Sequence, residues 1–133
     1  MQCVIGIDIG TSATEGCLVD LADGKVVTRI QVNYPPGFDN PDGYPNGAEQ
    51  RATVWSRAAL RVINELARGS DKRGGSVEAM AVSSMVGGLN IPVDRDWKPL
   101  RTVPIWLDRR ATREAAAAEL GALAERFKGL VGR

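Results

Sequence analysis

The stretch VIGIDIGTSATEGCLVD, residues 4–20, decides the fold. The residues from 3 to 9 are almost continuously aliphatic and β-branched, which predicts a central strand covered on both faces. A Gly-Thr-Ser turn at 10–12 interrupts this pattern, and residues 15–21 resume it as a second strand. Because a third strand is expected over 25–32, the chain should open with an antiparallel meander.

The remainder of the chain alternates loops, helices and short strands. Proline and glycine crowd residues 34–48, which predicts a loop. Apolar positions recur at helical spacing over 51–68, where we expect an amphipathic helix that ends at Gly69. A strand over 77–83 should then run parallel to its neighbour, because a helix precedes it. Further elements are expected at 89–93 as an extension of the sheet, at 103–106 as a short strand and at 109–127 as a helix.

The composition is that of an ordinary globular domain. The 133 residues include 17 basic and 16 acidic side chains, a balance that gives no reason to expect nucleic acid or a membrane as partner. Histidine is absent from the sequence, so proton transfer would fall to a carboxylate. The two cysteines suit a reducing compartment, and neither a signal peptide nor a membrane span is expected. We therefore expect a cytoplasmic protein.

The sharpest chemical signal follows the first strand. Asp8 would be costly at the end of a buried strand unless it met a cation or hydrogen-bond donors. Gly10 allows close backbone approach, and Thr11 and Ser12 add hydroxyls and amides that can hold phosphate oxygens. Asp8 could then hold Mg²⁺ directly or through water. The alternative is an ordinary hairpin whose polar side chains satisfy their own turn.

Several segments resemble one known family in the order that the family has them. Residues 4–20 resemble the first phosphate-binding motif of the FGGY carbohydrate kinases, within the actin-like ATPase superfamily. Glu49-Gln50 leading to Trp55 resembles the family's "EQ…W" start of the first long helix. Residues 80–88 look like the strand and loop that touch the sugar, and PIWLDRRAT at 104–112 resembles the "W-x-D-x-R" segment.

The resemblance implies transfer of the ATP γ-phosphate to a hydroxyl of a sugar or polyol. The expected fold class is α/β: an incomplete actin-like ATPase (ribonuclease H-like) domain, with a mixed sheet, three antiparallel first strands and flanking helices. In the family the catalytic base and the adenine pocket come from later sequence. The site residues it implies here are Asp8 as the Mg²⁺ and catalytic candidate, Gly10, Thr11 and Ser12 for ATP, and Ser84, Met85, Trp106 and Asp108 for the acceptor.

Each of these roles has a plainer alternative. Trp106 could be a core aromatic, and Asp108 could cap the helix that follows it. Met85 could simply fill a gap in the core. Arg109 and Arg110 could pair with phosphate or could belong to a solvated helix start.

Three positions depart from the family pattern. Glu15 stands where many members carry a basic residue, and a carboxylate facing the phosphates would repel them. Arg51-Ala52 replaces the usual Asp-Pro, so the expected helix cap is missing. Residues 85–87 (Met-Val-Gly) replace the usual glutamine and polar pair, so the acceptor is not fixed by this loop.

The expected domain organisation is incomplete. Residues 1–133 correspond to the N-terminal part of the first actin-like (FGGY N-terminal) domain, with the second domain outside this chain. We expect a pentulose such as xylulose as acceptor, with glycerol next, and expect the 133-residue chain alone to be inactive. The alternatives are a non-catalytic truncated remnant and an actin- or chaperone-like ATPase without a sugar acceptor. A homodimer of the full-length protein is also compatible with the resemblance.

Overall fold

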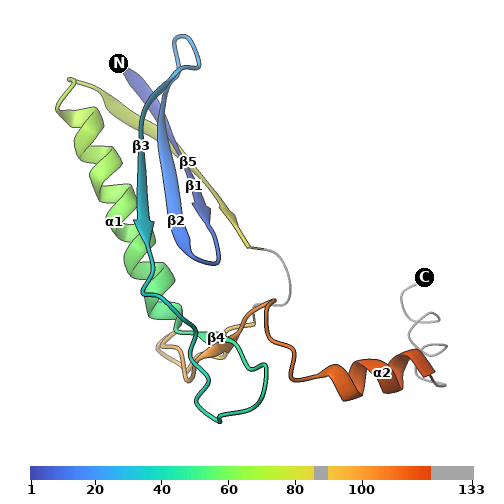
Figure 1. Ribbon diagram of the computed structural model, residues 1–133. Helices are drawn as coiled ribbons and strands as arrows, with labels where there is room; N and C mark the ends of the chain where they lie inside the picture. Colours follow the sequence, from blue (N-terminus) through green and yellow to red (C-terminus); the bar gives the residue numbers. More distant parts are fainter. Residues whose placement is uncertain (86–89, 121–133) are drawn as a thin grey trace.

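The computed structural model describes residues 1–85 and 90–120, and its main feature is a four-stranded mixed sheet (Figure 1). The strand order is β3-β2-β1-β5. Neighbours among the first three strands are antiparallel, whereas β5 runs parallel to β1. The predicted meander and the predicted parallel strand are therefore confirmed. The strand bounds are β1 Gln2–Ile9, β2 Ala13–Asp20, β3 Val26–Asn33 and β5 Ser76–Ser84.

Helix α1 (Ala52–Asp71) covers one face of this sheet. It buries one stripe at helical spacing, formed by Trp55, Ala58, Val62, Leu66 and Ser70. Gly16 of β2 permits the close approach, since a Cβ there would lie 2.6 Å from Val62 and 2.9 Å from Leu66. The helix runs past the predicted end at Gly69. At its N-terminus, Arg51 makes no side-chain capping hydrogen bond.

β1 alternates between its two faces. Cys3, Ile5 and Ile7 are buried beneath α1, while Asp8 on the opposite face is exposed. The prediction that the strand is covered on both faces is thus wrong for the described residues, because they supply a covering helix on one side only.

A second, smaller layer lies below the end of the sheet where β1 stops (Figure 1). It pairs β4 (Glu49–Gln50) with β6 (Val103–Pro104) in antiparallel fashion. Its core joins the loop before β4, the start of α1 and the segment after β6. The buried members are Tyr34, Ala48, Trp55, Ala58, Val103 and Ile105. This layer brings residues near 50 and near 105 up to the turn between β1 and β2.

The expected sheet extension at 89–93 is wrong where the structure describes it; residues 86–89 lie outside the described part. Val93 makes only an isolated bridge with Pro99. Asp94 closes the turn between them by accepting from the N–H groups of Asp96 and Lys98, at 2.9 and 2.8 Å. Pro92 also lacks the N–H that a ladder position would need.

Helix α2 (Thr112–Leu120) begins three residues later than position 109, where we expected it, and projects away from the sheet (Figure 1). The predicted continuation to residue 127 lies outside the described residues.

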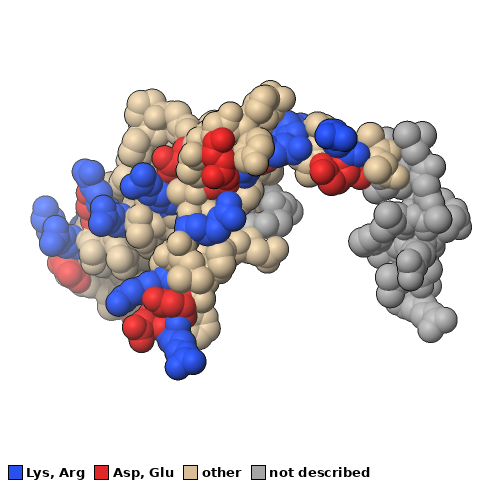
Figure 2. Space-filling view, turned by 90° about the horizontal axis from the view of Figure 1, so that it is seen from below, with Lys and Arg blue, Asp and Glu red and all other residues tan. Residues whose placement is uncertain are grey.

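On the face shown in Figure 2, Lys and Arg side chains lie among Asp and Glu side chains. Within residues 1–85 and 90–120, no helix has the length and apolar character needed to cross a membrane.

Candidate active site

The turn between β1 and β2 carries the residues expected to hold phosphate. Gly10 donates its N–H to the carbonyl of Ala13 at 2.9 Å, so this amide closes the hairpin. A Cβ on Gly10 would lie 3.1 Å from that carbonyl oxygen, which explains the need for a small residue. Among the described residues, the N–H groups of Thr11 and Ser12 donate no hydrogen bond. Two backbone donors are therefore free in this turn.

Thr11 is the point where three distant segments meet. Trp106 donates its indole N–H to Thr11 Oγ1 at 2.9 Å. The Thr11 hydroxyl in turn donates to Met85 Sδ, a weak acceptor, at 3.9 Å. Gln50 Nε2 donates to the Thr11 carbonyl at 2.8 Å. The structure thus brings Thr11, one of the three phosphate candidates, into direct contact with Met85 and Trp106, which were predicted to face the acceptor.

Asp8 lies at the end of β1 on the open face of the sheet. It is directly opposite Glu15 in the β1–β2 register, so both carboxylates point to the same side. They line a groove of about 410 Å³ to which Arg29 also contributes. The Glu15 carboxylate therefore lies beside that of Asp8 on the open face of the sheet.

The donor set at this groove suits magnesium. Mg²⁺ is usually bound through one or two carboxylates, with water and substrate phosphates completing its octahedron. Asp8 supplies one such carboxylate, on the strand that leads into the turn with the free amides of Thr11 and Ser12. Within the described part of the chain, no group of three His, Cys, Asp or Glu side chains is placed to hold a metal. Any metal here would rely on phosphate and water for its other ligands.

Ser84 and Met85 close the end of β5. Met85 donates its N–H to the carbonyl of Ile9 at 2.9 Å, which continues the pairing with β1. Both residues line a largely apolar pocket of about 640 Å³. Met85 also packs against the second core, so it fills a gap there as well as contacting Thr11.

Trp106 is not a core residue. Its exposed fraction is 53%, and its indole N–H is held by Thr11. The core alternative is therefore wrong, and a large aromatic surface remains open beside the phosphate turn.

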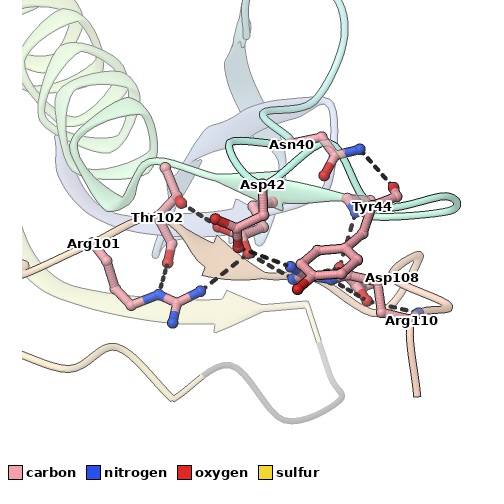
Figure 3. A network of polar contacts seen from close by, with 9 residues as sticks. Asn40, Asp42, Tyr44, Arg101, Thr102, Asp108 and Arg110 are labelled. Atoms are coloured by element: carbon pink, nitrogen blue, oxygen red, sulfur yellow. Dashed lines mark hydrogen bonds and ion pairs between the residues drawn. The ribbon is translucent and has the colours of Figure 1, made fainter.

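Asp108 is held inside a polar network shown in Figure 3. It accepts from the N–H of Ala48 at 2.9 Å and from the backbone and guanidinium of Arg110, at 3.0 and 2.8 Å. Because α2 begins at Thr112, the capping alternative is wrong. The Arg110 hydrogen bond lowers the pKa of Asp108 to about 2, despite opposing burial. Its predicted contact with a substrate hydroxyl stays a prediction.

The same network holds Glu49, which is completely buried. Its carboxylate accepts from Arg110 at 2.6 Å, from Arg101 at 3.1 Å and from the Thr102 hydroxyl. Burial raises the pKa of Glu49, but the hydrogen bonds from Thr102 and Arg110 outweigh it and leave the pKa below its ordinary value. Arg110 is therefore ion-paired, so the alternative of a solvated helix start is wrong for this residue. Arg109 is exposed.

Gln50 was not among the predicted site residues. It is 7% exposed and touches Thr11 directly. The signal that could have found it is the Glu49-Gln50 pair itself, since two consecutive polar residues between a Pro/Gly-rich loop and a helix need buried partners.

Comparison with known proteins agrees with this geometry. The chain matches the N-terminal domain of the FGGY family of carbohydrate kinases over residues 3–129. It is 32% identical over 112 residues to a xylulose kinase of Bacillus subtilis (strain 168), covering 84% of this chain and 21% of that protein. It is 24% identical over 115 residues to a glycerol kinase of Rhodospirillum centenum (strain ATCC 51521 / SW), covering 86% of this chain and 22% of that protein.

A solved structure shows the same fold. The ligand-bound xylulose kinase from Lactobacillus acidophilus superposes with a TM-score of 0.80 at 26% identity, over 96% of this chain and 24% of that one. The predicted actin-like α/β class is confirmed by this likeness. The chain spans about a fifth of the length of the curated relatives that it matches. From the matched domain and these relatives, the chain belongs to the FGGY family of carbohydrate kinases.

Proposed function

We propose that this chain is part of an ATP-dependent kinase that transfers the γ-phosphoryl group to a hydroxyl of a sugar or polyol. The contact of Thr11 with Trp106 carries this proposal, because it joins a turn with free amides to an open aromatic surface. A phosphate held at the turn and an acceptor lying on the indole would be neighbours. Family membership supports the same reaction class.

The residues of the turn would act by positioning and by neutralising charge, which is most of what phosphoryl transfer requires. The N–H groups of Thr11 and Ser12 would donate to phosphate oxygens, while Gly10 keeps the backbone close to them. Asp8 would hold the Mg²⁺ that accompanies ATP, and that ion would offset charge on the phosphates. As the family resemblance implies, the base for the acceptor hydroxyl would come from sequence outside this chain.

The acceptor would lie against the indole of Trp106, near Ser84 and Met85. An aromatic face suits the carbon side of a sugar, and polar groups around it select hydroxyl positions. A pentulose such as xylulose is favoured over glycerol, because the xylulose kinase relative is 32% identical and the glycerol kinase relative 24%. Asp108 would contribute by fixing the segment that carries Trp106, because its carboxylate is held by Ala48 and Arg110.

The whole protein would then be a two-domain cytoplasmic enzyme whose partner is a small sugar. Residues 1–133 would form the N-terminal part of its first actin-like domain.

The test is ATP-dependent phosphorylation of a panel of ketoses and polyols by the full-length protein. We expect one acceptor class to be phosphorylated, and Asp8→Asn to lower turnover by about two orders of magnitude or more. Asp23→Asn is the matched control, because Asp23 is exposed in the turn at the opposite end of the sheet. Acceptor-independent ATP hydrolysis would contradict the kinase proposal and favour a plain ATPase. A near-normal rate for Asp8→Asn would dismiss its metal role.

A further inference from the structure

Gln50 links the phosphate turn to the first long helix. Its side chain spans from the Thr11 carbonyl, which it reaches at 2.8 Å, to the indole N–H of Trp55 at 2.9 Å. Only 7% of Gln50 is exposed, and Trp55 is buried as well. The hydrogen bond to Trp55 is thus buried, and the one to Thr11 is partly buried.

The orientation of this amide is determined by its partners. The Trp55 indole can only donate, so the Gln50 carbonyl oxygen must face it. The Thr11 carbonyl can only accept, so the Gln50 NH₂ group must face the turn. A glutamate at this position would keep the acceptor for Trp55 but would place a carboxylate oxygen against the Thr11 carbonyl.

The hydrogen bond from Gln50 to the Thr11 carbonyl also fixes the direction of a backbone donor, the Ser12 N–H. That carbonyl and the N–H of Ser12 belong to one planar trans peptide unit, so they point in opposite directions. The hydrogen bond from Gln50 therefore directs the Ser12 N–H away from the Gln50 side chain. The next peptide unit is held in a similar way, because Tyr34 donates its N–H to the Ser12 carbonyl at 2.8 Å.

We propose that Gln50 is a positioning residue that orients the Ser12 N–H toward the nucleotide phosphates. This inference rests on the proposed kinase function. Gln50 itself does not touch the nucleotide; it fixes the peptide plane of the residue that does. Its loss should weaken nucleotide binding and slow transfer, while leaving acceptor binding at Trp106 nearly unchanged.

The experiment compares full-length wild type with Gln50→Glu. Calorimetry with Mg·ATP in the absence of acceptor is the first measurement, and KM values for ATP and acceptor are the second. We expect Gln50→Glu to weaken Mg·ATP binding about tenfold and to lower kcat, with the acceptor KM within about threefold of wild type. Should Gln50→Glu not fold, Gln50→Met takes its place, because it has similar length and no N–H to donate.

Two controls separate positioning from stability. Trp55→Phe removes the other hydrogen bond of Gln50 and leaves its bond to Thr11, so Mg·ATP affinity should stay within about threefold of wild type. Gln2→Glu makes the same chemical change at the far end of β1 and should have no effect. Equal losses of affinity in Gln50→Glu and Trp55→Phe would show a purely structural role and overturn the proposal, as would unchanged affinity in Gln50→Glu. Binding of Mg·ATP is measured without acceptor, so it does not depend on phosphoryl transfer. A wild-type protein that binds Mg·ATP but phosphorylates no acceptor would contradict the proposed kinase function and leave the proposal about Gln50 standing.

Discussion

Glu15 places a second carboxylate beside Asp8, opposite it in the β1–β2 register. Two like charges at one face of a groove repel an incoming polyphosphate unless a cation lies between them. We expect Glu15→Lys in the full-length protein to tighten nucleotide binding by about three- to tenfold, a range typical of one partly screened charge interaction. Calorimetry at low and moderate salt measures this change.

The matched control for this variant is Glu78→Lys. Glu78 is exposed on β5 near its start, distant in the register from Asp8, and should leave nucleotide affinity unchanged. Equal affinities for wild type and Glu15→Lys would mean that the phosphates do not pass this side chain.

Removing either of two buried hydroxyls should change the free energy of unfolding in different ways, because one hydroxyl is hydrogen-bonded and the other is not. Thr14 Oγ1 is bonded to the Tyr34 hydroxyl at 2.8 Å, whereas Ser70 Oγ has no partner among the described residues. We expect Thr14→Val to lower the free energy of unfolding by about 1–3 kcal/mol, because it leaves the Tyr34 hydroxyl unsatisfied. Ser70→Ala should be neutral or stabilising, since an unbonded buried hydroxyl is costly. Urea unfolding of the two variants compares them, and a larger loss in Ser70→Ala would contradict this reading.

At the scale of elements, the β4–β6 layer depends on ionised carboxylates. The Arg110 hydrogen bond lowers the pKa of Asp108 to about 2, and the pKa of Glu49 is also below its ordinary value. A carboxylate whose pKa is lowered in the folded state stabilises the fold above its unfolded pKa, near 4. That contribution is lost as pH falls from about 4 to about 2.

We therefore expect the urea midpoint of the full-length protein to drop between about pH 5 and about pH 2.5, and to drop less in Asp108→Asn. The variant lacks the carboxyl that takes up a proton. Asp96→Asn is the control, because the Asp96 side chain is 75% exposed. If the urea midpoint fell with pH by the same amount in wild type and Asp108→Asn, Asp108 would not be the source of the pH dependence.

The sequence pattern predicted correctly those elements whose formation depends on neighbouring residues in the sequence. The β1–β2–β3 meander follows from strand periodicity and short turns, and α1 follows from its apolar stripe. The segment at 90–93 was misjudged because its apolar residues suggested a strand, while Pro92 and the Asp94 turn fold it into a small hairpin. The start of α2 was misplaced because Arg110 is engaged by Glu49 instead of opening the helix.

The candidate site was predictable in its residues but less so in its contacts. Resemblance placed Thr11 and Trp106 in one site, yet only the fold shows that they share a hydrogen bond across 95 positions of sequence. The contact of Gln50 with the turn was missed because its partner, the Thr11 carbonyl, lies 39 positions away in the sequence.

At the scale of the whole molecule, β5 is an uncovered edge. Its residues are all exposed, with Val77, Met80 and Val82 among them, and no described residue pairs with its outer side. An apolar edge strand of this kind invites pairing with another chain. We expect the 133-residue chain on its own to self-associate at about 100 µM and to show no sugar-dependent ATP turnover.

Val82→Lys should weaken that association, because a charge on an edge strand blocks pairing. Leu60→Lys is its control: Leu60 is 60% exposed on α1, away from the edge. Sedimentation velocity over a range of concentrations provides the measurement. A wild-type chain that stays monomeric would show that the edge is protected in some other way.

The central claim is that the turn at 10–12 holds the phosphates of a magnesium nucleotide. A crystal structure of the full-length protein with Mg²⁺ and a non-hydrolysable ATP analogue tests it most directly. We predict phosphate oxygens at roughly 3 Å from the backbone nitrogens of Thr11 and Ser12, with the metal reached from Asp8 directly or through water. Phosphates bound elsewhere, with Asp8 bonded only to neighbouring backbone, would contradict the account.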